Sequence, residues 1–244
     1  MIRLLFLSAI VLAGLFGADS AHAQALSLDL GEEGTLTGRV VQLVLLLTVL
    51  SLAPSILITV TSFTRMVVVL SLLRSAMGTQ QAPPNIVMIS LALFMTGFVM
   101  APVFEEAYDA GLQPLLEEQI EPGEAFELMS QPFKTFMLKH VREDDLELFV
   151  NLSADPTPQT RQDIGLQVLI PSFMISELRR AFEIGFLLFI PFIVIDLVVS
   201  SVLMSMGMMM LPPIMIALPF KLIFFVLVDG WSLVAGSLVK SFIG

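Results

Sequence analysis

The sequence has no cysteine and few charged residues for its length. The absence of cysteine from its 244 residues excludes disulfide bonds, thiolate metal sites and cysteine nucleophiles. Charged residues make up 14% of the chain and hydrophobic residues 56%, whereas soluble domains carry about 25% charged and about 45–50% apolar residues. This composition argues against a soluble enzyme. The apolar residues also gather in long blocks, which favours a membrane protein.

The motifs of common catalytic and metal sites are also missing. The sequence has no glycine-rich phosphate loop, no HExxH pair and no GxSxG turn. Its two histidines are His22, which lies in the leader described below, and His140, so one histidine is left and cannot complete a zinc site. The run Glu143-Asp144-Asp145 lacks the spacing of a calcium loop, and we expect it to begin a helix. The sequence therefore predicts no catalytic residue, no cofactor and no metal, and we expect that the protein is not an enzyme.

Acidic residues concentrate in the middle of the chain. Between Glu105 and Gly165 there are fourteen acidic and four basic residues, and the rest of the chain has eight of each. Nucleic-acid binding is disfavoured, because phosphates need a basic surface. We interpret the acidic stretch as a solvated polar segment.

The N-terminus has the pattern of a secretory signal peptide. Arg3 is followed by an apolar stretch, Leu4–Phe16, and by the small-x-small cleavage site formed by Ala21 and Ala23. We expect residues 1–23 to be removed, which leaves the mature N-terminus outside the cytoplasm. The alternative is an uncleaved membrane anchor, for which the apolar run is short.

Four apolar blocks then predict an all-α protein of the membrane type, since a span needs about 20 apolar residues. The blocks are Val40–Val60, which Met66–Leu73 could extend, Ile86–Phe104, Ile184–Met204 and Ile214–Val228. Prolines inside the blocks predict kinks; they are Pro54, Pro191 and Pro219.

The blocks divide the mature chain into two helical hairpins, residues 24–104 and 171–244, separated by the acidic segment, residues 105–170. Four passes place both termini and a small helical acidic segment in the periplasm. In that segment, helical spacing predicts one amphipathic helix after Pro132 and a second short helix. The apolar residues of the first are Phe133, Phe136, Met137, His140 and Val141, and those of the second are Leu146, Leu148, Phe149 and Leu152. We expect His140 to be a packed or surface residue, not a ligand.

Positive charges support this orientation in part. Arg65 and Arg74 lie toward the cytoplasmic turn, as the positive-inside rule expects. Two further arginines lie on the opposite side, and we expect acids within one helical turn to neutralise them. The arginines are Arg179 and Arg180, and the acids are Glu177 and Glu183.

A short pattern recurs at an offset of 129 residues in the two hairpins. In each copy Met-Gly is followed, after four residues, by Pro-Pro, so that glycine ends one helix and proline begins the next. The copies are Met77-Gly78 with Pro83-Pro84 and Met206-Gly207 with Pro212-Pro213. The recurrence indicates either a duplicated hairpin or a chance repeat of common turn residues.

Two charges inside the last two apolar blocks stand at equal depth. Asp196 lies ten residues before Met206, and Lys221 lies nine residues after Pro212, which puts both about 14–15 Å from the turn at about 1.5 Å per residue. An unpaired charge at a helix centre costs about 2.5–3.5 kcal/mol. We therefore expect the two to pair within one hairpin or between subunits. The alternative is a proton relay.

Methionines cluster at the same turn. Six of the fifteen lie between Met204 and Met215, including the run Met208-Met209-Met210. Methionine is unbranched and adaptable, so the cluster is either packing filler or a deformable ring contributed by several copies around an axis. Such a ring would exclude water and ions when shut.

Three stretches carry a resemblance to a known family. They are PSFMISELRRAFEIGFLLFIPFIVIDLVVSSVLMSMGMMMLPPIMIALPFKLIFFVLVDGW (Pro171–Trp231), LAPSILITVTSFTRMVVVLSLLRSAMG (Leu52–Gly78) and APPNIVMISLALFMTGFVMAPVF (Ala82–Phe104). They closely resemble the FliP family, the P subunits of the flagellar type III export gate. With the leader and the acidic segment, the likeness covers essentially the whole chain, least clearly over 105–165.

The resemblance implies a bacterial inner-membrane and flagellar basal-body protein. It implies that several copies, which we expect to number five, form a closed helical ring with Q and R subunits and other export-apparatus proteins. Unfolded flagellar proteins would pass through this gate. The resemblance also implies that Met208, Met209 and Met210, together with Met206, form a methionine gasket. It further implies that much of the assembly lies above the bilayer, where the charged residues face protein.

Two other functions remain open at this point. One is the homologous subunit of a virulence injectisome, which the signal peptide disfavours. The other is a proton-coupled transporter, which would explain charges within apolar helices but calls for a polar substrate site at the membrane midplane.

Overall fold

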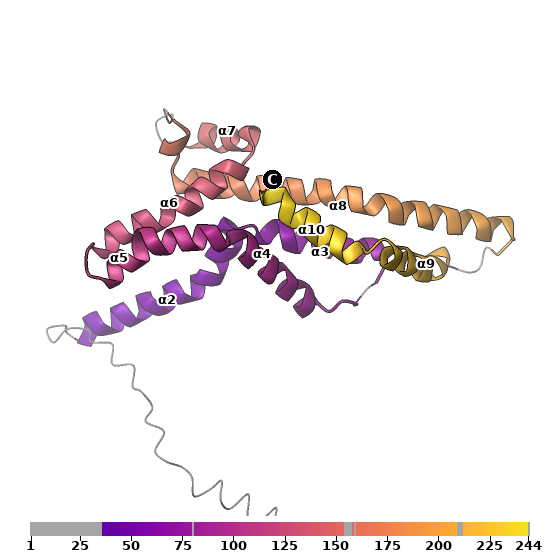
Figure 1. Cartoon of the computed structure of the whole chain (residues 1–244), viewed down its shortest axis with the longest axis horizontal. Coiled ribbons are helices and arrows are strands. Elements are labelled where there is room, and N and C mark those ends of the chain that lie inside the picture. The colour runs from indigo at the N-terminus through magenta and orange to yellow at the C-terminus, as the bar shows by residue number, and fades with distance from the viewer. Residues whose placement is uncertain (1–35, 80, 154–157, 159, 209–211, 244) are drawn as a thin grey trace, which may run out of the picture. The chain divides into compact units, whose positions relative to one another are not determined.

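Every element described by the computed structural model is helical (Figure 1). The described residues are 36–79, 81–153, 158, 160–208 and 212–243. The expected signal peptide, with Ala21 and Ala23, and the methionines Met209 and Met210 lie outside them. Two helices are long and apolar enough to cross a membrane, and two bent pairs also pass if each counts as one span. The expected all-α, membrane-type fold is confirmed.

The elements follow one another without a strand in the described residues. They are α2 (Leu36–Val60), α3 (Phe63–Met77), α4 (Asn85–Ala107), the π-helix η1 (Tyr108–Leu112), α5 (Gln113–Leu116), α6 (Pro122–His140), α7 (Glu143–Leu152), the 3-10 helix η2 (Arg161–Asp163), α8 (Leu166–Ser205), α9 (Pro213–Leu227) and α10 (Gly230–Ile243).

The chain divides into two units, with the boundary between Ser51 and Leu52. In the first unit, the N-terminal part of α2 exposes apolar side chains such as Val44 and Leu47. The remaining description concerns the second unit.

Four candidate spans correspond to the four expected blocks, but two of them are bent. Asn85–Leu116 and Leu166–Ser205 are continuous, whereas Pro54–Val60 and Phe63–Met77 meet at 83° and α9 and α10 meet at 62°. These two bends lie after Val60 and after Leu227. Pro54, Pro191 and Pro219 lie inside α2, α8 and α9, and the kinks expected at them stay a prediction. At the first bend the Thr61 hydroxyl donates to the Leu57 carbonyl (2.6 Å) and accepts from the Phe63 amide (3.3 Å), so side-chain bonds replace helical ones.

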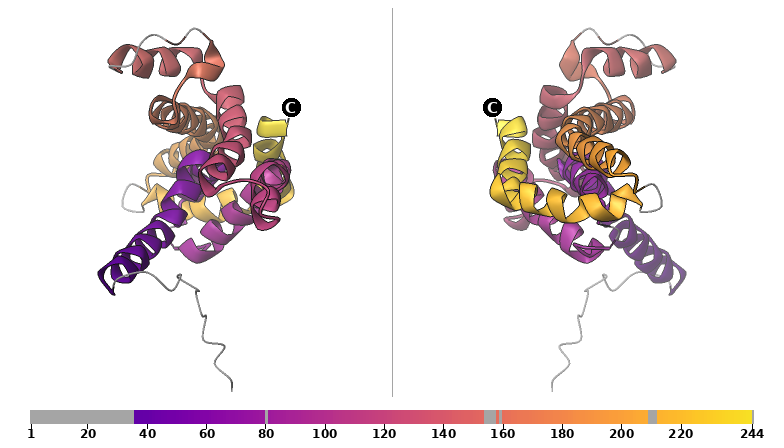
Figure 2. Two further views of the ribbon diagram at one scale, coloured as in Figure 1. Left: turned by 90° about the vertical axis from the view of Figure 1, so that its left-hand side faces the viewer. Right: turned by 90° about the vertical axis from the view of Figure 1, so that its right-hand side faces the viewer.

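The core of the second unit lies between α3 and the N-terminal half of α8. Met66, Leu73, Leu169 and Phe173 are almost fully buried there. At Gly185 the helices approach so closely that an added Cβ would lie 2.3 Å from Leu72 Cδ1. Figure 1 shows α6 and α7 beside this half of α8 and α9 beside the other half, and both views in Figure 2 show α10 next to α4.

Both hairpin turns carry glycine in the left-handed conformation. Gly78 follows α3 with φ 77°, and Gly207 follows α8 with φ 74°. Pro84 precedes α4, and Pro213 is the first residue of α9, preceded by Pro212. A side chain is strained at such φ values, so each glycine permits the end of its helix.

The acidic segment is helical, but its first helix begins earlier than expected. α6 begins at Pro122, and Pro132 lies buried inside it. Proline at the first position of a helix has a suitable φ and no amide to satisfy, so Pro122 is the better start signal. The second helix, α7, begins at Glu143 with three acids in its first turn, as expected.

Candidate functional site: buried ion pairs and the methionine turn

A buried ion pair joins α3 to α8. Arg65 Nε lies 2.8 Å from Glu177 Oε2, and Arg65 Nη2 lies 2.5 Å from Glu177 Oε1. The side chains are 1% and 0% exposed. This bidentate geometry is the strong form of an arginine–carboxylate contact, and it satisfies a charge that would otherwise be costly among apolar helices.

The same arginine holds the end of α10. Arg65 Nη1 donates to the Ser241 hydroxyl at 2.9 Å and to the Ser241 carbonyl at 3.4 Å. Its guanidinium carbon lies 3.7 Å from the centre of the Phe242 ring, within cation–π range. One side chain therefore links three helices that are far apart in sequence.

His140, at the end of α6, completes this cluster. Its ring lies 4.7 Å from that of Phe136 and 5.1 Å from that of Phe242, centre to centre. Burial, followed by the charges of Arg65 and of two further cations, lowers the pKa of His140 to about 4. His140 is therefore neutral near pH 7, as a packed residue.

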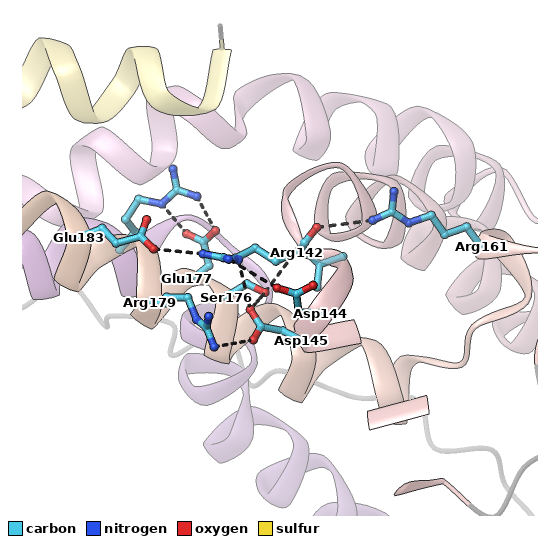
Figure 3. A network of polar contacts seen from close by, with 10 residues as sticks. Arg142, Asp144, Asp145, Arg161, Ser176, Glu177, Arg179 and Glu183 are labelled. Atoms are coloured by element: carbon cyan, nitrogen blue, oxygen red, sulfur yellow. Dashed lines mark hydrogen bonds and ion pairs between the residues drawn. The ribbon is translucent and has the colours of Figure 1, made fainter. Parts of the chain in front are cut away.

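A second polar network fastens α7 to α8 (Figure 3). The Asp145 carboxylate is 3% exposed, accepts a hydrogen bond from the Ser176 hydroxyl at 2.8 Å and lies 3.3 Å from Arg179. The Ser176 hydroxyl in turn accepts from the Arg142 amide at 3.0 Å. Arg142 also pairs with Glu183 at 3.1 Å. The start of the acidic helix is thus anchored, not only solvated.

These networks correct the expected pairing along α8. Neither Glu177 nor Glu183 pairs with Arg179 or Arg180; their partners come from other elements, and Arg180 makes no ion pair with any described residue. Pairs three or four residues apart form along one exposed helix face. Here Glu177 is turned into the interface with α3, so tertiary packing decides its partner.

Asp196 and Lys221 come together within one hairpin. Lys221 Nζ lies 2.7 Å from Asp196 Oδ2 and donates to the Ala76 carbonyl at 3.2 Å. Lys221 is 4% exposed, whereas the Asp196 side chain is 35% exposed. The ammonium thus joins α8, α9 and the end of α3, beside the Gly78 turn.

The described methionines of the turn are open to the surface. Met206 is 58% exposed and Met208 42%. Beside them, α8 and α9 border a cavity of about 550 Å³ with a wholly apolar lining, which includes Val198, Met206 and Phe220. This arrangement offers a soft apolar surface and no polar group for chemistry.

Among the residues that the structure describes, no group of three or more His, Asp or Glu side chains could hold a metal ion.

Sequence reasoning missed Arg65 as a site residue, and with it Asp145, Ser241 and Phe242. Arg65 did carry a signal, since it is a charge within the apolar stretch Phe63–Leu73. The partners of Arg65 are more than 100 residues away, and no local pattern points to them.

Long apolar helices whose charges pair within the protein define an all-α protein of the membrane type. The sequence profile of the FliP family matches residues 46–238, and the chain belongs to this family. The expected resemblance is confirmed. The chain is therefore a flagellar biosynthesis and export protein with a membrane location.

Its relatives match over most of their length. The flagellar biosynthetic protein FliP of Caulobacter vibrioides is 65% identical over 234 residues, 96% of this chain and 88% of the relative. FliP of Bacillus subtilis is 55% identical over 202 residues, 83% of this chain and 91% of the relative. FliP of Rhizobium meliloti is 49% identical over 234 residues, 95% of each chain.

Proposed function

We propose that this chain is a core subunit of the flagellar type III export gate. Five copies, with Q and R subunits and in contact with other export-apparatus proteins, enclose a channel through which unfolded flagellar proteins leave the cell. Membership of the FliP family and the flagellar names of the relatives support this function over the injectisome alternative. Many apolar side chains of the single chain are exposed, among them Phe94 at 80% and Leu227 at 79%, which supports assembly with other subunits.

The observation that carries the proposal is the exposed methionine turn at the end of the 40-residue helix α8. Met206 and Met208, with Met209 and Met210, would face the channel axis in the ring. Flexible, apolar side chains can close around one another and around a passing polypeptide. The turn then acts as a seal and has no catalytic role.

The gate lies in the bacterial inner membrane at the flagellar basal body, with both termini in the periplasm after removal of residues 1–23. The subunit is a conduit and not an enzyme. A proton-coupled transporter would need a polar substrate site near the midplane. The cavity between α8 and α9 has an apolar lining, and the acidic cavity formed by Glu105, Glu106 and Asp109 lies toward the end of its span.

The test is ion leakage through the gate. Replacing Met208, Met209 and Met210 together by alanine removes the bulk of the seal, and we expect cells to leak small ions. Replacing the same three by leucine keeps the apolar volume, and we expect little leakage. Unchanged leakage with normal flagellar export in the alanine variant would contradict the proposal.

A further inference from the structure

The last turn of α10 is held by a cluster that has no part in the proposed seal. Phe242 is 3% exposed, with Arg65 against its ring and His140 near it. Phe136 stacks on the same ring at 6.0 Å, with an interplanar angle of 19°. Side chains from α3 and α6 thus surround a residue two positions from the end of the chain.

The charges around His140 are almost all positive. Arg65 on α3, Lys139 on α6 and Arg180 on α8 all disfavour a proton on His140. Glu177 is close by, but both of its oxygens are bound by Arg65, and Lys240 on α10 is exposed. A protonated His140 would be a buried cation beside a second buried cation, and no carboxylate among the described residues forms an ion pair with it.

We propose that the end of α10 is an acid-sensitive latch, in which a proton on His140 drives Phe242 away from Arg65 and releases the last turn. The released state is favoured by acid because it lets the imidazolium reach water. This inference concerns the chain's own packing and does not depend on the proposed seal.

The direction of the effect follows from the pKa of His140. In the latched state the pKa is about 4, and in a hydrated, released state it returns toward its ordinary value of about 6.5. The released state therefore binds more protons between these values, so the latch has its full stability above pH 6.5 and loses it as the pH falls toward 4. Over this range the ratio of released to latched protein rises by up to about tenfold for each unit by which the pH falls.

Hydrogen exchange of the full-length protein, measured from pH 7.5 to 4, tests the latch. We expect the protection factors of amides 238–243, corrected for intrinsic exchange, to fall as the pH is lowered. For each pH unit, the fall should be about tenfold greater in wild type than in His140→Phe. Amides 95–100 in α4 serve as the internal control, since global unfolding would lower them equally. If the protection factors of these amides depend on pH equally in wild type and His140→Phe, the release is due to protonation of a carboxylate and the proposal is overturned.

A second variant covers the case in which His140→Phe does not fold. Phe242→Leu removes the ring but keeps an apolar side chain. We expect protection of amides 238–243 to be low already at pH 7.5 and its extra acid dependence to be lost. If the protection factors of amides 238–243 in Phe242→Leu depend on pH as strongly as in wild type, the latch proposal is also overturned.

Discussion

The two halves of α8 hold their charged side chains in different ways. In residues 166–185, which we call the packed half, seven residues are buried, and Glu177 and Arg179 pair with partners from α3 and α7. In residues 186–205, the exposed half, two residues are buried, and the charge of Asp196 is met by Lys221 alone. The exposed half also leads into the methionine turn.

This difference separates the part of the helix that maintains the fold from the part available to other chains. In the packed half the buried carboxylate of Glu177 accepts two hydrogen bonds from Arg65, and such pairing is the condition for a buried charge to be tolerated. The exposed half shows apolar side chains on most of its surface, among them Val194 and Leu197. A single subunit leaves these uncovered, and a ring of subunits would bury them.

The largest effect is expected for Glu177→Ala in the packed half. Removing the carboxylate leaves Arg65 buried and unpaired, which costs about 3–5 kcal/mol of unfolding free energy. Thermal or denaturant unfolding of the detergent-solubilised protein, followed by circular dichroism, measures this loss. The matched control is Glu183→Ala on the same helix; Glu183 is 58% exposed, so its loss should stay below about 1 kcal/mol. Equal losses in the two variants would contradict the assignment.

The second effect tests the layer that covers the packed half. Gly111 in η1 lies so close to α6 that an added Cβ would meet the Ala125 carbonyl oxygen at 2.7 Å and the Met129 amide nitrogen at 3.1 Å. Because backbone atoms cannot move aside cheaply, Gly111→Ala should cost roughly 2–3 kcal/mol, near the upper end for overpacking. Gly97→Ala on α4, where no atom lies within 4 Å, should gain about 0.5–1 kcal/mol from helix propensity. Similar unfolding midpoints for both variants would refute this packing.

The third effect concerns the pair in the exposed half. Asp196→Ala leaves Lys221 with one carbonyl partner, and we expect a loss of about 1–2 kcal/mol in unfolding free energy, within the range for an unsatisfied buried group. The charge swap, Asp196→Lys with Lys221→Asp, restores the ion pair but turns a carboxylate toward the Ala76 carbonyl. It should therefore recover part of the stability and assembly lost in the single variants. If neither the single variants nor the swap change stability or assembly, the pair has no structural role.

The sequence predicts the fold class and the exposed half better than the packed half. Apolar block length identifies the helices, and glycine and proline mark the turns, because both signals are local. Asp196 and Lys221 lie at equal distances from one hairpin turn, which can also be predicted from local spacing, and the two side chains do form an ion pair.

The bends and the buried network could not be predicted in this way. The bend after Val60 depends on hydroxyl bonds and on packing of α3 against α8, while Pro54 lies inside α2. Glu177 has one basic residue three positions away on its own helix, Arg180, yet its partner is Arg65, 112 positions away. Local spacing predicts that a charged residue pairs with the nearest opposite charge on its own helix. Glu177 instead pairs with Arg65 because both side chains are buried at the interface between two helices.

The smallest effect on stability should come from the exposed half, and it tests the comparison most directly. Leu197 is 64% exposed and Leu169 is 0% exposed on the same helix. Leu169→Ala should lower the unfolding free energy by about 2–5 kcal/mol, whereas Leu197→Ala should change it by no more than about 0.5 kcal/mol. Leu197→Asn should likewise fold, but it should form fewer oligomers in native mass spectrometry, because a polar group would lie where another subunit is proposed to pack. If Leu197→Ala destabilises the isolated chain as much as Leu169→Ala, the exposed half belongs to the fold of the single subunit, and the division of α8 into two roles is wrong.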